Sequence, residues 1–403
     1  MGAELAGFAP VATVEWNRWA CDTLRENKRA GFPLVRDWNV VEGDVREVDW
    51  SQYSDVALVS GGPPCQPFSL GGSSRSHDDD RDMFPALIRV LRTLGPQAFL
   101  IENVRGLTRA RFENYFQYIL LQLESPELAA KPNETWTEHL SRLQAEHTRG
   151  PRHGLHYNVV SQVLNAADFG VPQQRHRVFF VGLRSDLSLN FSFPKPTHSS
   201  SALVHSQWVS GEYWRATGVK QRDRPTMPPA IMRKLKALQD LDESELAKPW
   251  RTVRQALEGL PDPRKPHRTD IRNHESQPGA RSYPGHTGSV LDAPAKTLKA
   301  GSHGVPGGEN MLRLSETDVR YFTVREAARL QTFPDGFELH GAWSEAMRQI
   351  GNAVPVALAA AVSRSLRDAL DSSSCGKHAR NGMPLDGSKK RSQAGTLSTQ
   401  TAQ

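Results

Sequence analysis

The stretch SGGPPCQPFSLGG, residues 60–72, follows the apolar run DVALV and sets a single cysteine, Cys65, among prolines and glycines. A cysteine nucleophile needs a fixed backbone, a lowered thiol pKa and partial exposure, and a Pro-Pro-Cys-Gln-Pro turn supplies the first of these. Most free cysteines are instead small buried core residues. Here the flanking prolines stop the chain from continuing as a strand or helix, so it must turn at the edge of a sheet. We therefore predict that Cys65 is a nucleophile.

Glu102 stands immediately after the apolar run AFLI, in the stretch FLIENVRGL. If this strand and the one before Cys65 run parallel, their carboxyl ends meet at one edge of the sheet. A carboxyl group there could donate or accept a proton beside the thiol. The alternative is a solvated glutamate at a helix N-terminus.

Arg175 and Arg177 occupy alternate positions where a strand begins in ADFGVPQQRHRVFFVG, so we expect them to point to the same face. Alternating arginines are commonly a solvated edge. The Gly-Val-Pro-Gln turn that precedes them favours a shaped site for an anion or a carbonyl group.

The elements that must position these residues are indicated by short apolar runs at 11–14, 56–59, 98–101 and 178–181, which are typical of buried strands. Helical patterns lie between them, for example at 19–27 and 85–94. This alternation predicts an α/β fold with a parallel sheet covered by helices on both sides. Ligands of such sheets bind at the carboxyl ends of the strands.

From about residue 183 the chain becomes rich in Pro, Ser, His and Arg, which predicts an inserted, irregular second domain with one helix near 230–246. Apolar periodicity returns at 323–333 and in a helical pattern at 354–370, which we expect to pack back on the sheet. The last 33 residues, from Asp371, are rich in Ser, Gly, Thr and Gln, and predict a disordered tail.

Composition limits the class of protein. The 403 residues contain only Cys21, Cys65 and Cys375, too few for a disulfide framework or a four-cysteine zinc site, so we expect no metal site and a reducing compartment. No apolar run is long enough to span a membrane, which predicts a soluble, cytoplasmic protein. The net charge is +6, and residues 183–319 carry 20 basic and 15 acidic side chains, so a polyanion-binding surface is expected there.

The motifs GGPPCQPFS, ENV, PQQRHR and QIGNAVPV, in this order and with TVREAARLQTFPD before the last, resemble the DNA (cytosine-5)-methyltransferase family of bacterial restriction-modification type. The resemblance covers about residues 1–183 and 287–366. It implies a Rossmann-like, S-adenosylmethionine-dependent methyltransferase sheet with a smaller inserted target-recognition domain. The corresponding division is a catalytic domain at 1–182, a target-recognition domain at 183–319, returning catalytic motifs at 320–370 and the tail at 371–403.

For the chemistry, the resemblance implies that Cys65 attacks carbon 6 of a cytosine flipped out of duplex DNA, while Glu102 binds the base edge and protonates its ring nitrogen. Arg175 and Arg177 match arginines that support the base and the catalytic loop. The segment 70–82 resembles the loop that closes over the flipped base.

For the cofactor, S-adenosyl-L-methionine, the resemblance implies that Glu15 binds the ribose hydroxyls, Trp16 lies on the adenine face and Asp44 reads the adenine amino group. Other positions expected near the cofactor are Pro64, Gly351, Asn352 and Val354. The residues expected to contact DNA are Gln66, Ser69 and Thr297, with Trp208 and Trp214 in the middle segment. Expected partners are double-stranded DNA and a cognate restriction endonuclease, with the chain a monomer associated with the bacterial nucleoid.

One feature departs from the family pattern. Members of the family begin with an apolar strand and a Phe- and Gly-rich loop around the cofactor, whereas this chain starts at MGAELAGFAP. We therefore expect the first strand and glycine loop to be absent, with a loss of stability or activity because neighbouring strands lose a partner. Met1 could instead be an internal methionine mistaken for the start. A non-catalytic DNA-binding remnant and an RNA-methylating relative remain the alternative functions.

Overall fold

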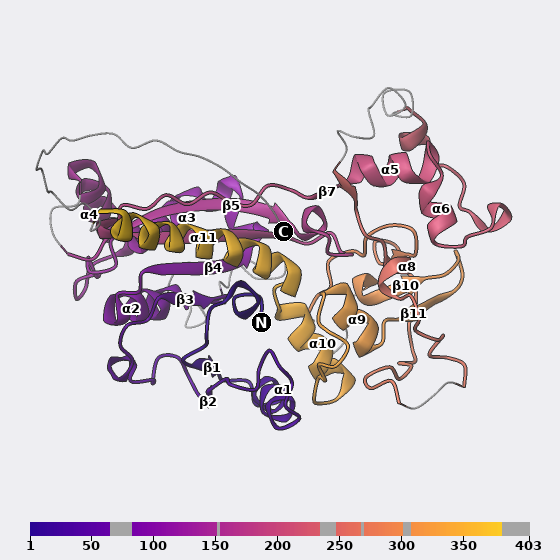
Figure 1. Ribbon diagram of the computed structural model, residues 1–403, viewed down its shortest axis with the longest axis horizontal. Helices are drawn as coiled ribbons and strands as arrows, with labels where there is room; N and C mark the ends of the chain where they lie inside the picture. Colours follow the sequence, from indigo (N-terminus) through magenta and orange to yellow (C-terminus); the bar gives the residue numbers. More distant parts are fainter. Residues whose placement is uncertain (65–82, 151–153, 234–246, 267–269, 301–307, 381–403) are drawn as a thin grey trace, which may run out of the picture.

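The computed structural model describes residues 1–64, 83–150, 154–233, 247–266, 270–300 and 308–380 (Figure 1). Cys65, Gln66, Ser69 and the segment 70–82 lie outside these residues, as do most of the predicted helix at 230–246 and the tail beyond residue 380.

A four-stranded sheet in the order β3-β4-β6-β5 forms the centre of the molecule. Its strands are β3 (Leu58–Gly61), β4 (Ala98–Val104), β5 (Tyr157–Asn165) and β6 (His176–Arg184). β3 and β4 are parallel, as predicted, but β6 is antiparallel to both β4 and β5. The prediction of a wholly parallel sheet is therefore wrong at this edge. The ten residues between β5 and β6 are too few for the crossover that a parallel connection needs.

A second, two-stranded sheet pairs β1 (Thr13–Glu15) with β2 (Val40–Glu42) in parallel, with Glu15 opposite Glu42. Helix α1 (Arg18–Arg29) connects the two strands. Figure 1 shows this pair on the side of β3 that faces away from β4. Within the described residues, β1 and β3 each hydrogen-bond to a single neighbouring strand.

Helices cover both faces of the central sheet. Successive side chains of β6 point to opposite faces and therefore pack against different helices. Phe180 lies in one core with α2 (Phe84–Leu94) and α3 (Glu113–Glu124). Phe179 and Val181 lie in the opposite core with α11 (Val356–Arg380), which runs across the sheet in Figure 1. The packing of residues 354–370 on the sheet is thus confirmed. The helix continues to Arg380, so a tail that is disordered from Asp371 is wrong for its first ten residues. Helix α4 (Trp136–Arg149) contacts α3.

The second region, which follows β6 in the sequence, lies at the right of Figure 1. Its helices are α5 (Ser200–Trp208), α6 (Glu212–Ala216) and α8 (Val253–Ala256), and its strands are β7 (His198–Ser199), β8 (Lys248–Pro249), β9 (Ser289–Val290), β10 (Met311–Arg313) and β11 (Val319–Tyr321). Trp214 is only 2% exposed and packs edge-on against Trp208 and Tyr213. The expected contact between Trp214 and DNA is therefore wrong, because this ring is the core of the region rather than its surface.

Helices α9 (Val324–Leu330) and α10 (Trp343–Asn352) share a core with α8 and with Leu298 and Leu312 of the second region. This core stands apart from the two cores on the central sheet. The chain from residue 295 to residue 350 thus leads from the second region to the last turn of α10, and α11 follows α10 directly. No helix among the described stretches is both long and apolar enough to cross a membrane.

Candidate active site

The described residues directly before Cys65 lie beside Glu102 and Asn103 of β4. Gly61 of β3 lies opposite Ile101 of β4, so the chain leaves the sheet next to Glu102. The Asn103 side chain donates a hydrogen bond to the Pro63 carbonyl at 2.9 Å. Beyond residues 65–82, the Met83 amide donates to the Pro64 carbonyl at 3.2 Å. The parallel pairing that placed the two motifs at one edge is confirmed, while Cys65 itself lies outside the described residues.

Gly62 has close packing against the same carboxyl group. A Cβ atom built on Gly62 would lie 3.0 Å from Glu102 Oε2, a separation shorter than almost all real contacts of this kind. A larger residue would therefore push the start of the loop away from Glu102 or displace the carboxyl group. This is a position where glycine allows the backbone to approach a functional side chain.

Glu102 pairs with Arg177 rather than with solvent. Arg177 Nε lies 2.7 Å from Glu102 Oε1, and the two side chains are 12% and 13% exposed. Burial raises the pKa of the Glu102 carboxyl, although Arg177 and Arg175 oppose this effect through their charge. A carboxyl group with a raised pKa can carry the proton that a general acid must deliver. Arg177 holds that group in place through a charge-assisted hydrogen bond.

Arg175 has a different role from Arg177, which the alternation of the two arginines in the sequence could not predict. Its side chain is 0% exposed and donates to three backbone carbonyls. These are Leu298 at 2.8 Å, Gly351 at 2.6 Å and Ala353 at 2.9 Å. Burial lowers the pKa of Arg175 to about 9. Arg175 therefore supports the backbone of two other segments, whereas Arg177 contacts the proposed acid.

The predicted cofactor residues Glu15 and Asp44 gather at the carboxyl ends of β1 and β2. Gly43 donates its amide to the Glu15 carbonyl at 3.0 Å. Asn17 caps α1 and donates its own amide to Glu15 Oε1, which turns the chain so that Trp16 is 75% exposed. An open indole face next to a carboxylate fits an adenosine group, with the ring on the adenine and the carboxylate on the ribose hydroxyls.

Asp44 is less available than the sequence suggested. Arg46 donates to both of its carboxylate oxygens, and the Arg46 backbone amide donates to Oδ1 at 2.8 Å. These hydrogen bonds lower the pKa of Asp44. An adenine amino group would have to share an oxygen that Arg46 already occupies.

The remaining predicted positions, Asn352 and Val354, lie where α10 passes into α11, and the segment 295–300 approaches the neighbouring Gly351. We call residues 295–300 the strap and residues 350–354 the α10–α11 turn. A Cβ atom on Gly351 would lie 2.3 Å from the Ala300 amide nitrogen, so only glycine permits this contact of two backbones. Within the strap, Thr297 is partly exposed and its hydroxyl donates to the Gln174 carbonyl at 2.7 Å.

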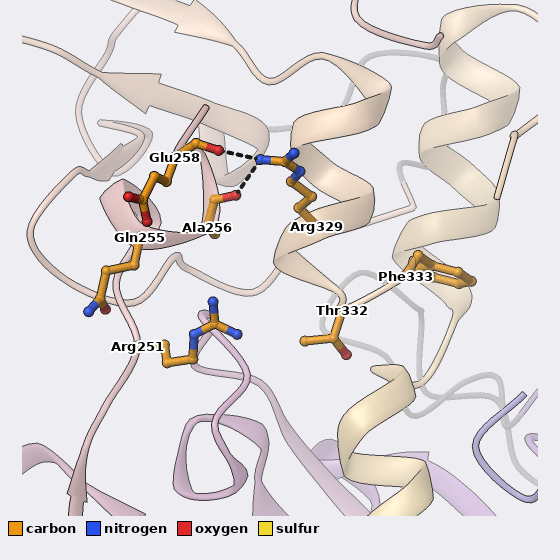
Figure 2. Close-up of a pocket in the computed structure, with 7 residues that line it drawn as sticks. All are labelled: Arg251, Gln255, Ala256, Glu258, Arg329, Thr332 and Phe333. Carbon is orange, nitrogen blue, oxygen red and sulfur yellow. Dashed lines mark hydrogen bonds between the residues drawn. The ribbon is translucent and has the colours of Figure 1, made fainter. Parts of the chain in front are cut away.

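A cavity of about 510 Å³ lies elsewhere, between α8 and the end of α9 (Figure 2). Figure 2 shows that Arg329 donates to the carbonyls of Ala256 and Glu258 on one side of the cavity. Thr332 lies on the other side of the cavity. No predicted site residue lines it. The site around Glu102 is therefore identified by its contacts and not by this cavity.

Sequence reasoning missed three residues that hold the site together, namely Asn103, Gln173 and Gln331. Each lies inside a motif already singled out, in ENV, PQQRHR and TVREAARLQTFPD. The available signal was a neutral polar residue next to an expected buried strand or helix, which must find a hydrogen-bond partner when it is buried.

Comparison with known proteins agrees with this arrangement. The family model described as C-5 cytosine-specific DNA methylase matches residues 1–128 and 152–368. The type II methyltransferase M.NgoMIV of Neisseria gonorrhoeae is 31% identical over 379 residues, which cover 92% of this chain and 94% of that protein. The type II methyltransferase M.Eco47II of Escherichia coli is 29% identical over 378 residues, covering 92% and 76%.

Solved structures show the same fold. A candidate DNA modification methyltransferase encoded within an E. coli prophage aligns with a TM-score of 0.52 at 21% identity, covering 92% of this chain and 95% of that one. A DNMT2 variant from Spodoptera frugiperda aligns with a TM-score of 0.50 at 16% identity, covering 91% and 96%. The Rossmann-like methyltransferase fold is thereby confirmed.

Proposed function

The chain belongs to the C-5 cytosine-specific DNA methylase family and is a DNA cytosine-5 methyltransferase, and from this premise we propose that it acts through a covalent bond between Cys65 and a flipped cytosine. The observation that carries the proposal is the anchoring of residues 62–64, which directly precede Cys65 in the sequence, beside the largely buried Glu102–Arg177 pair. We propose on this ground that Glu102 is the proton donor for a reaction that Cys65 begins as nucleophile.

The proposed reaction proceeds in balanced steps. The Cys65 thiolate forms a bond to carbon 6, and the electrons of the 5,6 double bond move toward carbon 5 while Glu102 delivers a proton to the ring nitrogen N3. Carbon 5 would then take the methyl group that S-adenosylmethionine supplies when bound, as the bond between this methyl group and the cofactor sulfur breaks. Release of the proton on carbon 5 to solvent then restores the double bond and expels the Cys65 thiolate, while N3 returns its proton to Glu102.

S-adenosylmethionine, when bound, supplies an electrophilic methyl group. Glu15 and Trp16 would hold its adenosine part at the carboxyl end of β1, and Pro64, Asn352 and Val354 would border it from β3 and the α10–α11 turn. Asp44 would contribute through the oxygen atoms that it shares with Arg46. In this proposal these residues only bind and orient the cofactor, and Glu102 alone exchanges a proton with the ring nitrogen.

We assign substrate recognition to residues 183–319, with Thr297 of the strap and with Gln66 and Ser69 as DNA contacts. The excess of basic over acidic side chains in this region suits a phosphate backbone. Duplex DNA is the proposed substrate, and the resemblance to type II methyltransferases supports a restriction-modification setting with a cognate endonuclease. The chain would then work as a monomer on DNA in the nucleoid.

Bisulfite sequencing tests this function. Duplex DNA of mixed sequence and a matched RNA pool are incubated together with the protein and S-adenosylmethionine, and cytosines that resist conversion are mapped. We expect protected cytosines in DNA at one recurring sequence, and none with Cys65→Ser. Protection in RNA alone would favour the RNA-methylating alternative. Protection in neither pool, from a protein that still binds DNA, would favour the non-catalytic remnant.

A further inference from the structure

Two buried glutamines link the strap to the α10–α11 turn. Gln173 and Gln331 are both 0% exposed, and Gln173 Nε2 donates to Gln331 Oε1 at 3.2 Å. Gln173 Oε1 accepts the amide of Leu298 in the strap at 2.9 Å. Gln331 Nε2 donates to the carbonyls of Ile350 at 2.7 Å and Ala353 at 3.2 Å. The result is a continuous path of hydrogen bonds from the strap to the turn.

Arg175 forms a second path between the same two segments. It donates to the Leu298 carbonyl and to the carbonyls of Gly351 and Ala353. Leu298 is therefore held at its amide by Gln173 and at its carbonyl by Arg175. These groups are buried except for Ala353, which is partly buried, so a lost partner is not readily replaced by bulk water.

The turn that carries Gln331 is itself tightly constrained. Thr332 has a φ of +58°, an uncommon backbone conformation for a β-branched residue. Its hydroxyl accepts the Ala357 amide in the first turn of α11, and the Gln331 carbonyl accepts the Val356 amide. Unusual conformations of this kind persist where surrounding contacts fix them, and they concentrate at functional sites.

We propose that Gln331 is a positioning residue that holds the α10–α11 turn for the cofactor and, through Gln173, couples it to the DNA-contacting strap. This rests on the proposed function, in which Asn352 and Val354 border the cofactor and Thr297 approaches DNA. Because the strap and the turn share one hydrogen-bonded network, DNA that orders the strap also orders the turn. Each ligand then raises the affinity for the other by the same factor.

A purely structural role would be different. Polar bridges of this kind can hold a fold together without affecting either ligand, and removing one would then lower stability alone. Gln122 supplies a matched control. It is a buried glutamine of α3 that donates to one backbone carbonyl, that of Tyr118 at 3.4 Å, outside the segments assigned to DNA or cofactor binding and away from the network.

The test measures the Kd of S-adenosylhomocysteine by calorimetry, with and without a duplex that carries the site mapped by bisulfite sequencing. In the wild type we expect the duplex to tighten binding. In Gln331→Met we expect binding weaker by about tenfold without DNA, and most of the tightening lost, because the Ile350 and Ala353 carbonyls lose the donor that Gln331 supplies and Gln173 loses its acceptor. Gln122→Met should lower the melting temperature and leave both constants unchanged.

The outcomes separate the two proposals. Wild-type protein without affinity for S-adenosylhomocysteine would overturn the proposed function, and this inference with it. Wild-type binding with an unchanged Kd and an unchanged effect of DNA in Gln331→Met would overturn the inference alone. If Gln331→Met does not fold, Gln173→Met serves instead, because it leaves the bonds from Gln331 to the turn in place. It should lose more of the effect of DNA than of the affinity itself, and the opposite result would overturn the coupling.

Discussion

At Glu102, burial and charge act in opposite directions on one carboxyl group. Burial between β4 and β6 raises its pKa, while Arg177 at 2.7 Å favours the ionised form. The same pair therefore allows the group to carry a proton and keeps its orientation fixed once the proton has left. This balance belongs to the two residues together, because neither effect alone would provide both states.

Glu102→Gln should lower kcat by about 10²- to 10⁴-fold, since the amide keeps the shape and a hydrogen bond but cannot deliver a proton. The affinity for DNA should change little. Steady-state rates of methyl transfer give this comparison, with Glu113→Gln on the solvent-exposed start of α3 as the control. A Glu102→Gln enzyme with a kcat close to that of the wild type would remove Glu102 from the chemistry.

Cys21 shows why a thiol can be unreactive in this molecule. It is 0% exposed, its Sγ donates to the Glu15 carbonyl at 3.2 Å, and burial, followed by the charges of Glu42 and Glu15, raises its pKa to about 11. Iodoacetamide at pH 8 should therefore leave Cys21 unmodified in the native protein, as read by peptide mass spectrometry. Rapid labelling of Cys21 under these conditions would contradict the buried position.

The raised pKa of Cys21 also has a consequence for stability. The unfolded thiol ionises near pH 9 and the folded thiol near pH 11, so ionisation favours the unfolded chain between these values. The contribution of Cys21 to the free energy of unfolding should be fully present below pH 9 and decline as the pH rises to about 11. Cys21→Ala should lack this decline, which urea unfolding at a series of pH values would reveal as a difference from the wild type.

At the scale of elements, the apolar runs predicted β1, β3, β4 and β6 within a few residues, because strands buried on both faces read as continuous apolar sequence. β5 was missed, since its outer residues are polar and it lies at the edge of the sheet. The direction of β6 was also wrong. It depends on the length of the preceding connection, which apolar runs do not report.

Gly182 of β6 is a position where the sheet leaves no room for a side chain. A Cβ atom there would lie 2.2 Å from the ring of Phe99, which is buried and packs edge-on against Tyr157. Gly182→Ala should lower the free energy of unfolding by about 1–3 kcal/mol, since the ring must leave its place. Urea denaturation measures this change.

Gly61 of β3 is the matched control, because it lies in the same sheet and a Cβ atom there meets nothing within 4 Å. Gly61→Ala should be neutral or slightly stabilising, by up to about 1 kcal/mol, through the smaller entropy of the unfolded chain. Equal effects of the two alanines would show that Phe99 does not pack on Gly182 as described.

Across the whole molecule, the motifs identified the site better than they identified how it is supported. The motifs of Cys65 and Glu102 could be placed at one sheet edge because parallel strands bring their carboxyl ends together. The two arginines could not be placed there in the same way, because they stand at the start of β6, whose antiparallel direction was not predicted. The separate roles of Arg175 and Arg177 could not be predicted, since they depend on Leu298 and Gly351, more than 120 positions further along the chain. The burial of Trp214 could not be predicted either, because composition does not say whether an aromatic ring of a small domain faces its core or its surface.

The covalent role of Cys65 is the central claim, and trapping with 5-fluorocytosine tests it most directly. Fluorine at carbon 5 blocks the loss of the proton that would release the enzyme. The protein is incubated with S-adenosylmethionine and mixed-sequence duplex DNA that contains 5-fluorocytosine, then denatured and separated on a gel. We expect a protein–DNA adduct that survives denaturation, requires the cofactor and disappears in Cys65→Ser. An adduct that persists in Cys65→Ser, or methylation of ordinary cytosine without any adduct, would contradict it.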